Sequence, residues 1–407
     1  MIPFSPPHID QLIIDEVSAT LRSGWITTGP RTKDFEKKLT AYAGHKATLC
    51  LNSASAGLEL MLRWFGVQAG DEVILPAYTY AATANVVVHC GATPVFVDSG
   101  NDFNLDMRCV RSAITTRTKV IMPVDIGGWP CDYGELNTLV RESAIVKLFK
   151  ATTPEQEKMG RILILSDAAH SIGATYHGHK TGRLTDISVF SFHAVKNLTT
   201  AEGGAVCLNL PVPFNNDEEY RRLNTKSLHG QNKDALAKTQ PGKWRYDIEE
   251  AGYKYNMTDI QAAMGLVELA RYDELILPRR RKIFDLYTEA FSAYDWAETP
   301  VFTTTERTSS YHVYALRIRN ISESRRDAII SRIFEKEVSV NVHYVPLPMM
   351  SFYKNMGYAI AGYPVAFDIY SREISLPVYF DLTDEQVNLV VQAVVKSVEE
   401  TLAPVSC

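Results

Sequence analysis

The stretch "FSFHAVKNLTTAEGGAV" (residues 190–206) places one basic residue, Lys196, in a loop between two apolar, strand-like segments. Burial lowers the pKa of a lysine and leaves more of its amine neutral, and a neutral amine can attack a carbonyl group. Lys196 is therefore a candidate for covalent chemistry. The alternative is an ordinary surface lysine, and the surrounding sequence has to distinguish the two.

Short apolar runs alternate with helical patterns over the first half of the chain. The runs that read as strands cover residues 46–51, 71–76, 93–98, 118–125, 161–167, 186–192 and 203–209. Helical patterns at 56–66 and 81–91 lie between the earlier ones. Alternating strands and helices predict crossover connections, so we expect an α/β fold whose mostly parallel, seven-stranded sheet is covered on both faces.

The second half of the chain has a different pattern. Residues 210–250 are polar and are expected to be irregular, and a long helical pattern follows over 257–291. Strand patterns at 311–318 and 338–346 then mix with helical patterns at 325–337 and 383–400. This mixture predicts a large domain of residues 1–260 with an N-terminal arm, and a smaller C-terminal α+β domain of residues 261–407.

Composition restricts the partners and the compartment. The chain has 407 residues, a formal net charge of -5 and no long basic run, which argues against nucleic acid and anionic membranes as partners. No apolar stretch is long enough to cross a bilayer, and the N-terminus does not read as a signal peptide. The six cysteines have no paired spacing, so free thiols in a reducing cytoplasm are expected.

Several polar residues stand where predicted strands end. Asp167 and Ser191 close two strands, Lys196 follows one of them, Tyr80 follows a third, and Ser55 opens the helix after the first. Ligands of open α/β sheets bind at the carboxyl ends of the strands, so we expect all five residues at one edge.

This set suits pyridoxal phosphate, which needs a lysine for its aldehyde, an acid for its ring nitrogen and a cradle for its phosphate. Asp167 can be the acid, Ser55 and Ser191 can hold phosphate, and Tyr80 can stack on the ring. Purely structural roles stay open for three of these residues, because Asp167 and Ser55 can cap helices and Tyr80 can pack in the core. A metal site is disfavoured because the histidines around Asp167 lack ligand spacing; they are His170, His177, His179 and His193.

Ordered motifs along nearly the whole chain carry a resemblance to a known family. They are "LRSGWITTGPRTKDFEKKL", "NSASAGLELML", "VILPAYTYAATANVVVHCGATPVFVD", "SDAAHSIGATYHG", "FSFHAVKNLTTAEGGAV", "GYKYNMTDIQAAMG", "VNVHYVPL" and "ISLPVYFDLTDEQ". The sequence resembles the nucleotide-sugar aminotransferases of the DegT/DnrJ/EryC1/StrS family. That resemblance implies the aspartate-aminotransferase fold, which is fold type I of the pyridoxal-phosphate enzymes.

The resemblance implies roles for individual residues. Lys196 matches the lysine that binds the cofactor and moves protons, and Asp167 matches the partner of the ring nitrogen. The remaining cofactor contacts implied are His170 beside the ring hydroxyl, Tyr80 stacked on the ring, Ala54, Ser55 and Ser191 at the phosphate, and Asn256 reaching the phosphate from a partner subunit. A homodimer with a shared active site is therefore expected.

The implied reaction moves an amino group from an amino acid, expected to be glutamate, to a nucleotide-linked keto sugar. The motifs look most like those of members that aminate C4 of a UDP-linked 4-keto sugar, so a UDP-4-keto-6-deoxy-hexose for surface polysaccharide is expected. Candidate substrate residues are Trp25 and Thr28 in "GWITTGP", His193, His343 and Tyr344. Interface packing is the alternative for Trp25 and Tyr344.

Three departures from the family pattern stand out. The usual "SGT" is "SAS" here, which puts Ala54 in place of a glycine. Residues 139–160 form a longer link than usual and read as a surface insertion. Lys238 stands near the place of an arginine that would suit the carboxylate of the amino donor.

Competing functions also remain at this stage. One is a C3 aminotransferase acting on a dTDP-keto sugar. A second is a related sugar dehydratase, which would carry a histidine in place of Lys196. A third is a non-catalytic regulator, although the chain keeps every catalytic position and has no helix-turn-helix appendage.

Overall fold

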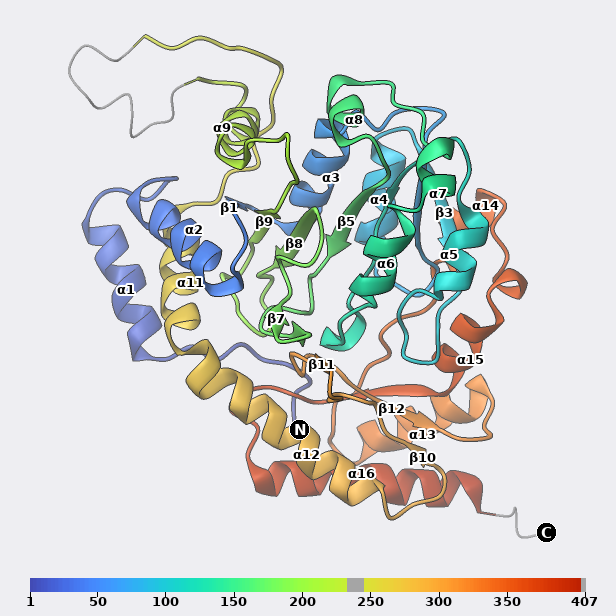
Figure 1. Cartoon of the computed structure of the whole chain (residues 1–407). Coiled ribbons are helices and arrows are strands. Elements are labelled where there is room, and N and C mark those ends of the chain that lie inside the picture. Colours follow the sequence, from blue (N-terminus) through green and yellow to red (C-terminus); the bar gives the residue numbers. More distant parts are fainter. Residues whose placement is uncertain (233–244, 404–407) are drawn as a thin grey trace.

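A computed structural model describes residues 1–232 and 245–403. Its centre is a seven-stranded sheet in the order β1-β9-β8-β5-β4-β2-β3, in which only β9 runs antiparallel to its neighbours (Figure 1). The strands are β1 Ala47–Leu51, β2 Glu72–Pro76, β3 Thr93–Val97, β4 Thr118–Ile121, β5 Leu163–Asp167, β8 Ile187–Ser191 and β9 Gly204–Leu208. All seven predicted strands are present, and the α/β fold class is confirmed.

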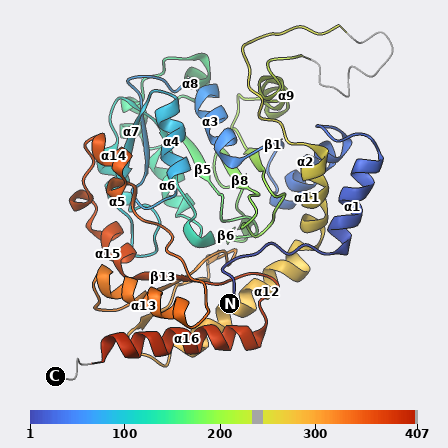
Figure 2. The same ribbon diagram turned by 180° about the vertical axis from the view of Figure 1, so that it is seen from behind.

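Helices cover both faces of this sheet, as Figures 1 and 2 show from opposite sides. One face carries α3 Ala54–Trp64 and α4 Ala81–His89; the other carries α2 Pro30–Ala43, α5 Met107–Ala113, α6 Tyr133–Leu139 and α11 Asp259–Arg271. Alternate residues of each strand serve alternate faces, so Leu49 and Leu51 pack with α3 while Cys50 packs with α2. Both faces of the strands are therefore buried, as expected of a mostly parallel sheet.

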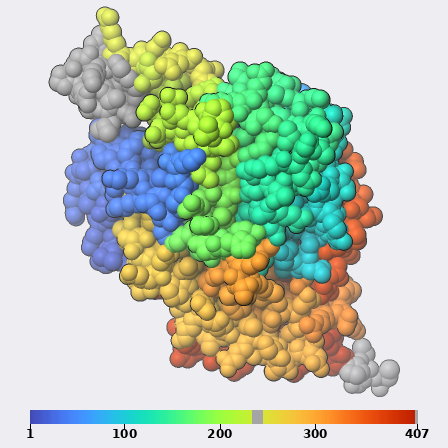
Figure 3. Space-filling view, viewed as in Figure 1, coloured from blue at the N-terminus to red at the C-terminus, as the bar shows by residue number. Residues whose placement is uncertain are grey.

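The C-terminal part builds a second, three-stranded antiparallel sheet in the order β10-β12-β13. Its strands are β10 Ala297–Glu298, β12 Tyr314–Ile318 and β13 Glu373–Leu376, and its helices are α12 Leu277–Phe291, α13 Glu323–Glu335, α14 Ser351–Asn355, α15 Pro364–Arg372 and α16 Asp384–Leu402. In Figure 3 most of this part, coloured gold to red, lies at the lower end of the molecule, and its segment with α14 and α15 rises along the right edge. The division of the chain into domains at residue 260 stays a prediction.

Smaller elements connect and flank these two sheets. Helix α1 packs on α11, and the π-helical segment η2 joins α11 to α12, so the predicted long helix is present over this range. The flanking elements are α1 Gln11–Arg22, α7 Ser143–Leu148, α8 Pro154–Met159, α9 Asn216–Ser227, η2 Tyr272–Ile276, the short turns η1 Ile126–Gly128, η3 Leu347–Met349 and η4 Ile360–Gly362, and a small sheet of β6 Thr175–Tyr176, β7 His179–Lys180 and β11 Arg307–Thr308. Across the described ranges, no helix combines the length and apolar character needed to cross a membrane.

Two sequence expectations were wrong. Residues 338–346 do not form a strand, because the chain there makes only single bridges, Val338 with Ile2 and Asn341 with Ser375. An alternation of apolar and polar residues indicates an extended backbone, but it does not show that another strand lies beside it. Within the segment expected to be irregular, α9 is a helix whose Asn215 cap and acidic first turn stabilise it without an obvious apolar stripe.

The longer link before β5 folds back on the molecule. It forms α7 and α8, and the buried side chain of Gln156 donates a 3.0 Å hydrogen bond to the carbonyl of Phe65. Five cysteines are free thiols, and four of them are buried, as expected. Lys238 and Cys407 lie outside the described residues.

Candidate active site

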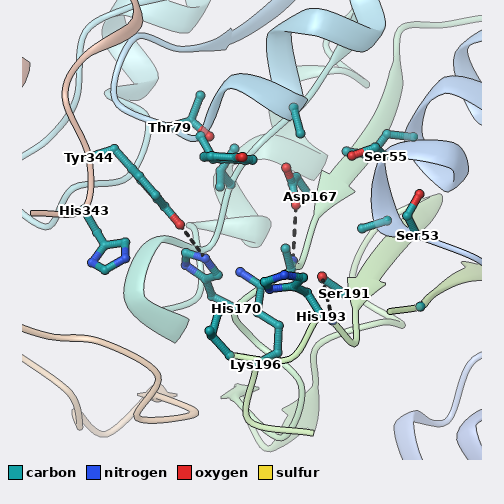
Figure 4. Close-up of a pocket in the computed structure, with 18 of the residues that line it drawn as sticks. Ser53, Ser55, Thr79, Asp167, His170, Ser191, His193, Lys196, His343 and Tyr344 are labelled. Atoms are coloured by element: carbon teal, nitrogen blue, oxygen red, sulfur yellow. Dashed lines mark hydrogen bonds between the residues drawn. The ribbon is translucent and has the colours of Figure 1, made fainter. Parts of the chain in front are cut away.

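A cavity of about 320 Å³ lies where β5 and β8 end and where α3 and α4 begin. It brings together ten of the predicted site residues: Ala54, Ser55, Tyr80, Asp167, His170, Ser191, His193, Lys196, His343 and Tyr344. Figure 4 labels all of these except Ala54 and Tyr80. The five residues expected at one edge of the sheet are all among them. These strand ends and helix starts share the cavity with a segment of the C-terminal part, residues 343–344.

Lys196 and Asp167 both line this cavity, and burial shifts the pKa values of both. Burial lowers the pKa of Lys196 to about 8, and the negative charge of Asp167 opposes that shift. Burial raises the pKa of Asp167, and hydrogen bonds from Thr83 and Ala169 oppose that rise. The cavity thus contains an amine that is partly neutral near physiological pH and an acid whose charge is supported by donors.

The start of helix α3 forms one wall. Ser53 caps the helix by accepting a 3.1 Å hydrogen bond from the N–H of Ala56, and Ser53, Ala54 and Ser55 all line the cavity. The first N–H groups of a helix have no partner within it and attract anions. Ala54 is already helical, a conformation open to any residue, so the glycine of the family pattern is not needed here.

Strand β9 passes close to this helix start. A side chain at Gly204 would place its Cβ 2.4 Å from the backbone nitrogen of Ala54, so only glycine permits the approach. Ser191, the last residue of β8, pairs with Gly204 in the sheet and also lines the cavity. The helix N-terminus and the Ser191 hydroxyl therefore make a site that fits a phosphate group.

His170 and Tyr344 form the opposite wall. Burial holds the pKa of His170 well below its usual value, so the ring is neutral. The N–H of Gly127 donates a 3.3 Å hydrogen bond to Nδ1, which leaves the proton on Nε2, 3.0 Å from the Tyr344 hydroxyl. The ring of Tyr80, 61% exposed, lies 5.6 Å from that of Tyr344, so Tyr80 is a residue of the cavity rim and not of the core.

Three predicted site residues lie outside this cavity. Trp25, Thr28 and Asn256 do not line this cavity. Asn256 donates a 2.7 Å hydrogen bond to the Thr28 hydroxyl, and the Trp25 indole donates a 3.2 Å bond to the Thr28 carbonyl. They form one cluster, and their roles stay predictions.

The structure adds residues that the sequence did not single out. Thr83 donates to Asp167, and it follows Tyr80 by three residues on α4, a spacing that could have indicated it. The ring of His312 is tilted against that of His170, with the ring centroids 4.3 Å apart, and its Nδ1 lies 2.8 Å from Oδ1 of Asn197, the residue after Lys196. Nothing in the local sequence indicates His312, because it comes from the C-terminal part by packing alone.

The sequence profile described as the DegT/DnrJ/EryC1/StrS aminotransferase family matches residues 7–153 and 155–395. The chain belongs to this family. Together the matched ranges cover nearly the whole sequence, so the resemblance noted on individual motifs is confirmed.

Individual members are similar over almost their full length. Spr1654 of Streptococcus pneumoniae, assigned as a sugar aminotransferase, is 45% identical in its PMP form, with a TM-score of 0.95, 99% of this chain covered and 100% of that chain. The spore coat polysaccharide biosynthesis protein SpsC of Bacillus subtilis is 35% identical, with 97% of this chain and 96% of SpsC covered. PseC of Helicobacter pylori, an aminotransferase involved in the biosynthesis of pseudoaminic acid, is 28% identical with a TM-score of 0.85, 98% of this chain covered and 99% of that chain.

The cofactor of this sugar aminotransferase is pyridoxal 5'-phosphate, since Spr1654 has been solved in PLP and PMP forms. The cavity fits it: a partly neutral lysine suits the aldehyde, a buried acid suits the ring nitrogen, and a helix N-terminus suits the phosphate. Among residues 1–232 and 245–403 no cluster of three or more His, Cys, Asp or Glu side chains could hold a metal ion.

Proposed function

We propose that this sugar aminotransferase moves an amino group from glutamate to C4 of a UDP-linked 4-keto-6-deoxy-hexose, for a surface polysaccharide. The observation that carries the transfer itself is the partly neutral Lys196 beside Asp167 in one cavity. The choice of C4 and UDP is supported by the motifs around Lys196 and Asn256. The product class is supported by the similarity to SpsC and PseC, whose names concern spore coat polysaccharide and pseudoaminic acid.

Bound pyridoxal phosphate would supply an aldehyde that carries the amino group and a ring that withdraws electrons. Asp167 would hold a proton at the ring nitrogen, and Thr83 and Ala169 would keep its carboxylate charged. Ser55, Ser191 and the N–H groups at the start of α3 would hold the phosphate. His170 would lie beside the ring hydroxyl, and Tyr80 would pack on the ring face.

Lys196 is the proton carrier in this account. Its Nζ accepts the proton from the α-carbon of glutamate, and later donates a proton to the sugar carbon that receives the nitrogen. Because its pKa is lowered to about 8, Lys196 can take either form near neutral pH. His193, His343 and Tyr344 line the same cavity and would contact the sugar, where neutral His343 and Tyr344 offer hydrogen bonds without charge.

We propose a homodimer in which each active site takes residues from both subunits. Trp25, Thr28 and Asn256 cluster outside the cavity of their own chain, and Tyr80 leaves a large aromatic surface exposed at the cavity rim. Apolar side chains of the N-terminal region are also exposed: Ile9, Leu12, Ile14, Leu21 and Ile26. A second copy would cover these side chains and bring Asn256 toward the phosphate. We expect the enzyme in the cytoplasm, where nucleotide sugars are made.

A direct competition tests the substrate. The purified enzyme with bound cofactor and glutamate is given equal concentrations of a UDP-4-keto sugar and a dTDP-3-keto sugar, and both amino sugars are quantified by mass spectrometry. Preference for the UDP-4-keto sugar supports the proposal. A clear preference for the dTDP-3-keto sugar would overturn the regiochemistry and leave the aminotransferase assignment in place.

A further inference from the structure

His343 is held from several directions by buried groups. Its backbone N–H donates a 3.1 Å hydrogen bond to Oε2 of Glu373, and its carbonyl accepts a 2.5 Å bond from the hydroxyl of Tyr78. The flanking residue Asn341 exchanges backbone hydrogen bonds with Ser375. This anchoring fixes a side chain that lines the active-site cavity (Figure 4).

The side chain of His343 is joined to a chain of hydrogen bonds. Its Nδ1 lies 2.9 Å from the hydroxyl of Ser375, and that hydroxyl lies 2.5 Å from Oε1 of Glu373. Glu373 and Ser375 are both fully buried on β13. A serine hydroxyl donates only one hydrogen bond, either to His343 or to Glu373. The protonation state of Glu373 therefore sets the direction of both hydrogen bonds, and with it which ring nitrogen of His343 carries a proton.

The surroundings of Glu373 favour its neutral form. Burial raises the pKa of Glu373 to about 8, and hydrogen bonds and the charges of Arg326 and Arg317 oppose the rise. The other titratable groups facing it are Tyr78 and Tyr344, whose pKa values are raised by burial, and His343, whose pKa burial lowers to about 4. At neutral pH these three groups are uncharged, so only the two arginines place charge near Glu373.

We propose that Glu373 and Ser375 are positioning residues that place a proton on Nε2 of His343, so that His343 donates a hydrogen bond to an acceptor-only oxygen of the nucleotide keto sugar. The neutral carboxyl donates to Ser375, Ser375 donates to Nδ1, and Nε2–H is left for the ligand. The ligand oxygen would belong to a carbonyl or a phosphate group, because the oxygens of both groups accept hydrogen bonds and cannot donate them. This inference rests on the proposed sugar amination.

Ionisation of Glu373 reverses the direction of the hydrogen bonds between Glu373, Ser375 and His343. Ser375 then donates to the carboxylate and accepts from Nδ1–H, so Nε2 of His343 loses its proton and faces the ligand oxygen as a second acceptor. Affinity for the keto sugar must therefore fall as the pH rises through the pKa of Glu373. In Glu373→Gln the amide oxygen would accept from the backbone N–H of His343, and the amide N–H would donate to Ser375 at every pH, which locks the donor form.

The test starts from the aminated enzyme and measures KM for the keto sugar on both sides of pH 8. Glu373→Gln keeps Lys196 and lacks the titrating carboxyl, so its KM at each pH is the reference for the titration of Lys196. For the wild type we expect KM to rise about fivefold or more above pH 8, the effect of losing one hydrogen bond.

Three variants test the origin of this rise. Glu373→Gln should keep the low-pH KM at every pH. Ser375→Ala should have a raised, pH-independent KM, and Ser375→Thr should restore the wild-type profile. The same rise in Glu373→Gln, or a wild-type KM in Ser375→Ala at pH 7, would overturn the proposal.

Two further measurements complete the design. The inhibition constant of UDP alone locates the oxygen: if it rises with pH like KM, the oxygen belongs to the nucleotide, and if it stays flat, the oxygen is the carbonyl of the keto sugar. Nitrogen NMR of the histidine rings, with His343→Gln to assign the signal, reports the tautomer without any sugar. A shift from Nε2–H to Nδ1–H above pH 8 that is absent in Glu373→Gln supports the relay even if amination of the keto sugar fails. An unchanged tautomer in the wild type would contradict it.

Discussion

The hydroxyl of Thr83 donates a 2.8 Å hydrogen bond to Oδ2 of Asp167, from the first turns of α4 to the end of β5. Both side chains are buried. The bond opposes the effect of burial on the pKa of Asp167, and so supports the charged form that a protonated ring nitrogen requires. In the mechanism we propose, Thr83 acts through Asp167 and is a positioning residue.

Replacing Thr83 with valine keeps the shape of the side chain and removes the donor. We expect kcat to fall about tenfold or more, since a hydrogen bond to a charged group is worth about 1.5–3 kcal/mol. Thr83→Ser, which keeps the hydroxyl, is the matched control and should stay near the wild-type rate. Steady-state kinetics at saturating substrate measure both, and equal rates for Thr83→Val and wild type would rule out this role.

Asp167→Asn should keep the fold and lose activity. The amide has nearly the same shape but no negative charge to hold the proton at the ring nitrogen, so we expect kcat to fall about a hundredfold or more. Asp98→Asn is the matched control, because Asp98 is a buried carboxylate that accepts hydrogen bonds from the N–H groups of Val365 and Ala366, outside the cavity. A rate near wild type in Asp167→Asn would make Asp167 a structural residue only.

The lowered pKa of Lys196 predicts how the apoprotein takes up its cofactor. The neutral amine is the reactive form, so the rate of covalent attachment should rise with pH and level off above about 8, far below the ordinary lysine value of 10.5. Because the charge of Asp167 raises this pKa, the midpoint should move to lower pH in Asp167→Asn. Absorbance during reconstitution follows the reaction, and a midpoint near 10.5 would show that Lys196 is not buried as described.

A shared active site predicts complementation. Lys196→Ala and Asn256→Ala should each be inactive in separate homodimers. When the two are mixed and allowed to exchange subunits, hybrid dimers should contain one site with both residues intact, and part of the activity should return. Full activity of the wild type as a monomer in sedimentation would contradict the dimer.

The fold was predictable because its signals are local. Each strand of the large sheet is an apolar run bounded by turns, and the residues that end these strands, Asp167 and Ser191 among them, fall at one edge by topology alone. The polar helix α9 was missed because its stability comes from a cap and charges. The prediction of a strand over residues 338–346 was wrong, because a strand also needs an adjacent strand to pair with, and the sequence of the segment does not show whether one is present.

The site was predictable only in part, for a related reason. Lys196, Asp167 and His170 were found because their motifs are contiguous in sequence. His312 and Glu373 were not, because packing of the C-terminal part brings them against His170 and His343. Trp25, Thr28 and Asn256 cluster outside the cavity of their own chain, and in the homodimer we propose they would complete the site of the second subunit.

Transfer of labelled nitrogen tests the central claim most directly. The enzyme with its cofactor is incubated with nitrogen-labelled glutamate and a UDP-4-keto-6-deoxy-hexose, and mass spectrometry follows the label. The account predicts a labelled amino sugar with the wild type and none with Lys196→Ala, which should also lack the absorbance of lysine-bound cofactor. Label in the sugar at the wild-type rate with Lys196→Ala, or no transfer by the wild type to any nucleotide keto sugar, would contradict it.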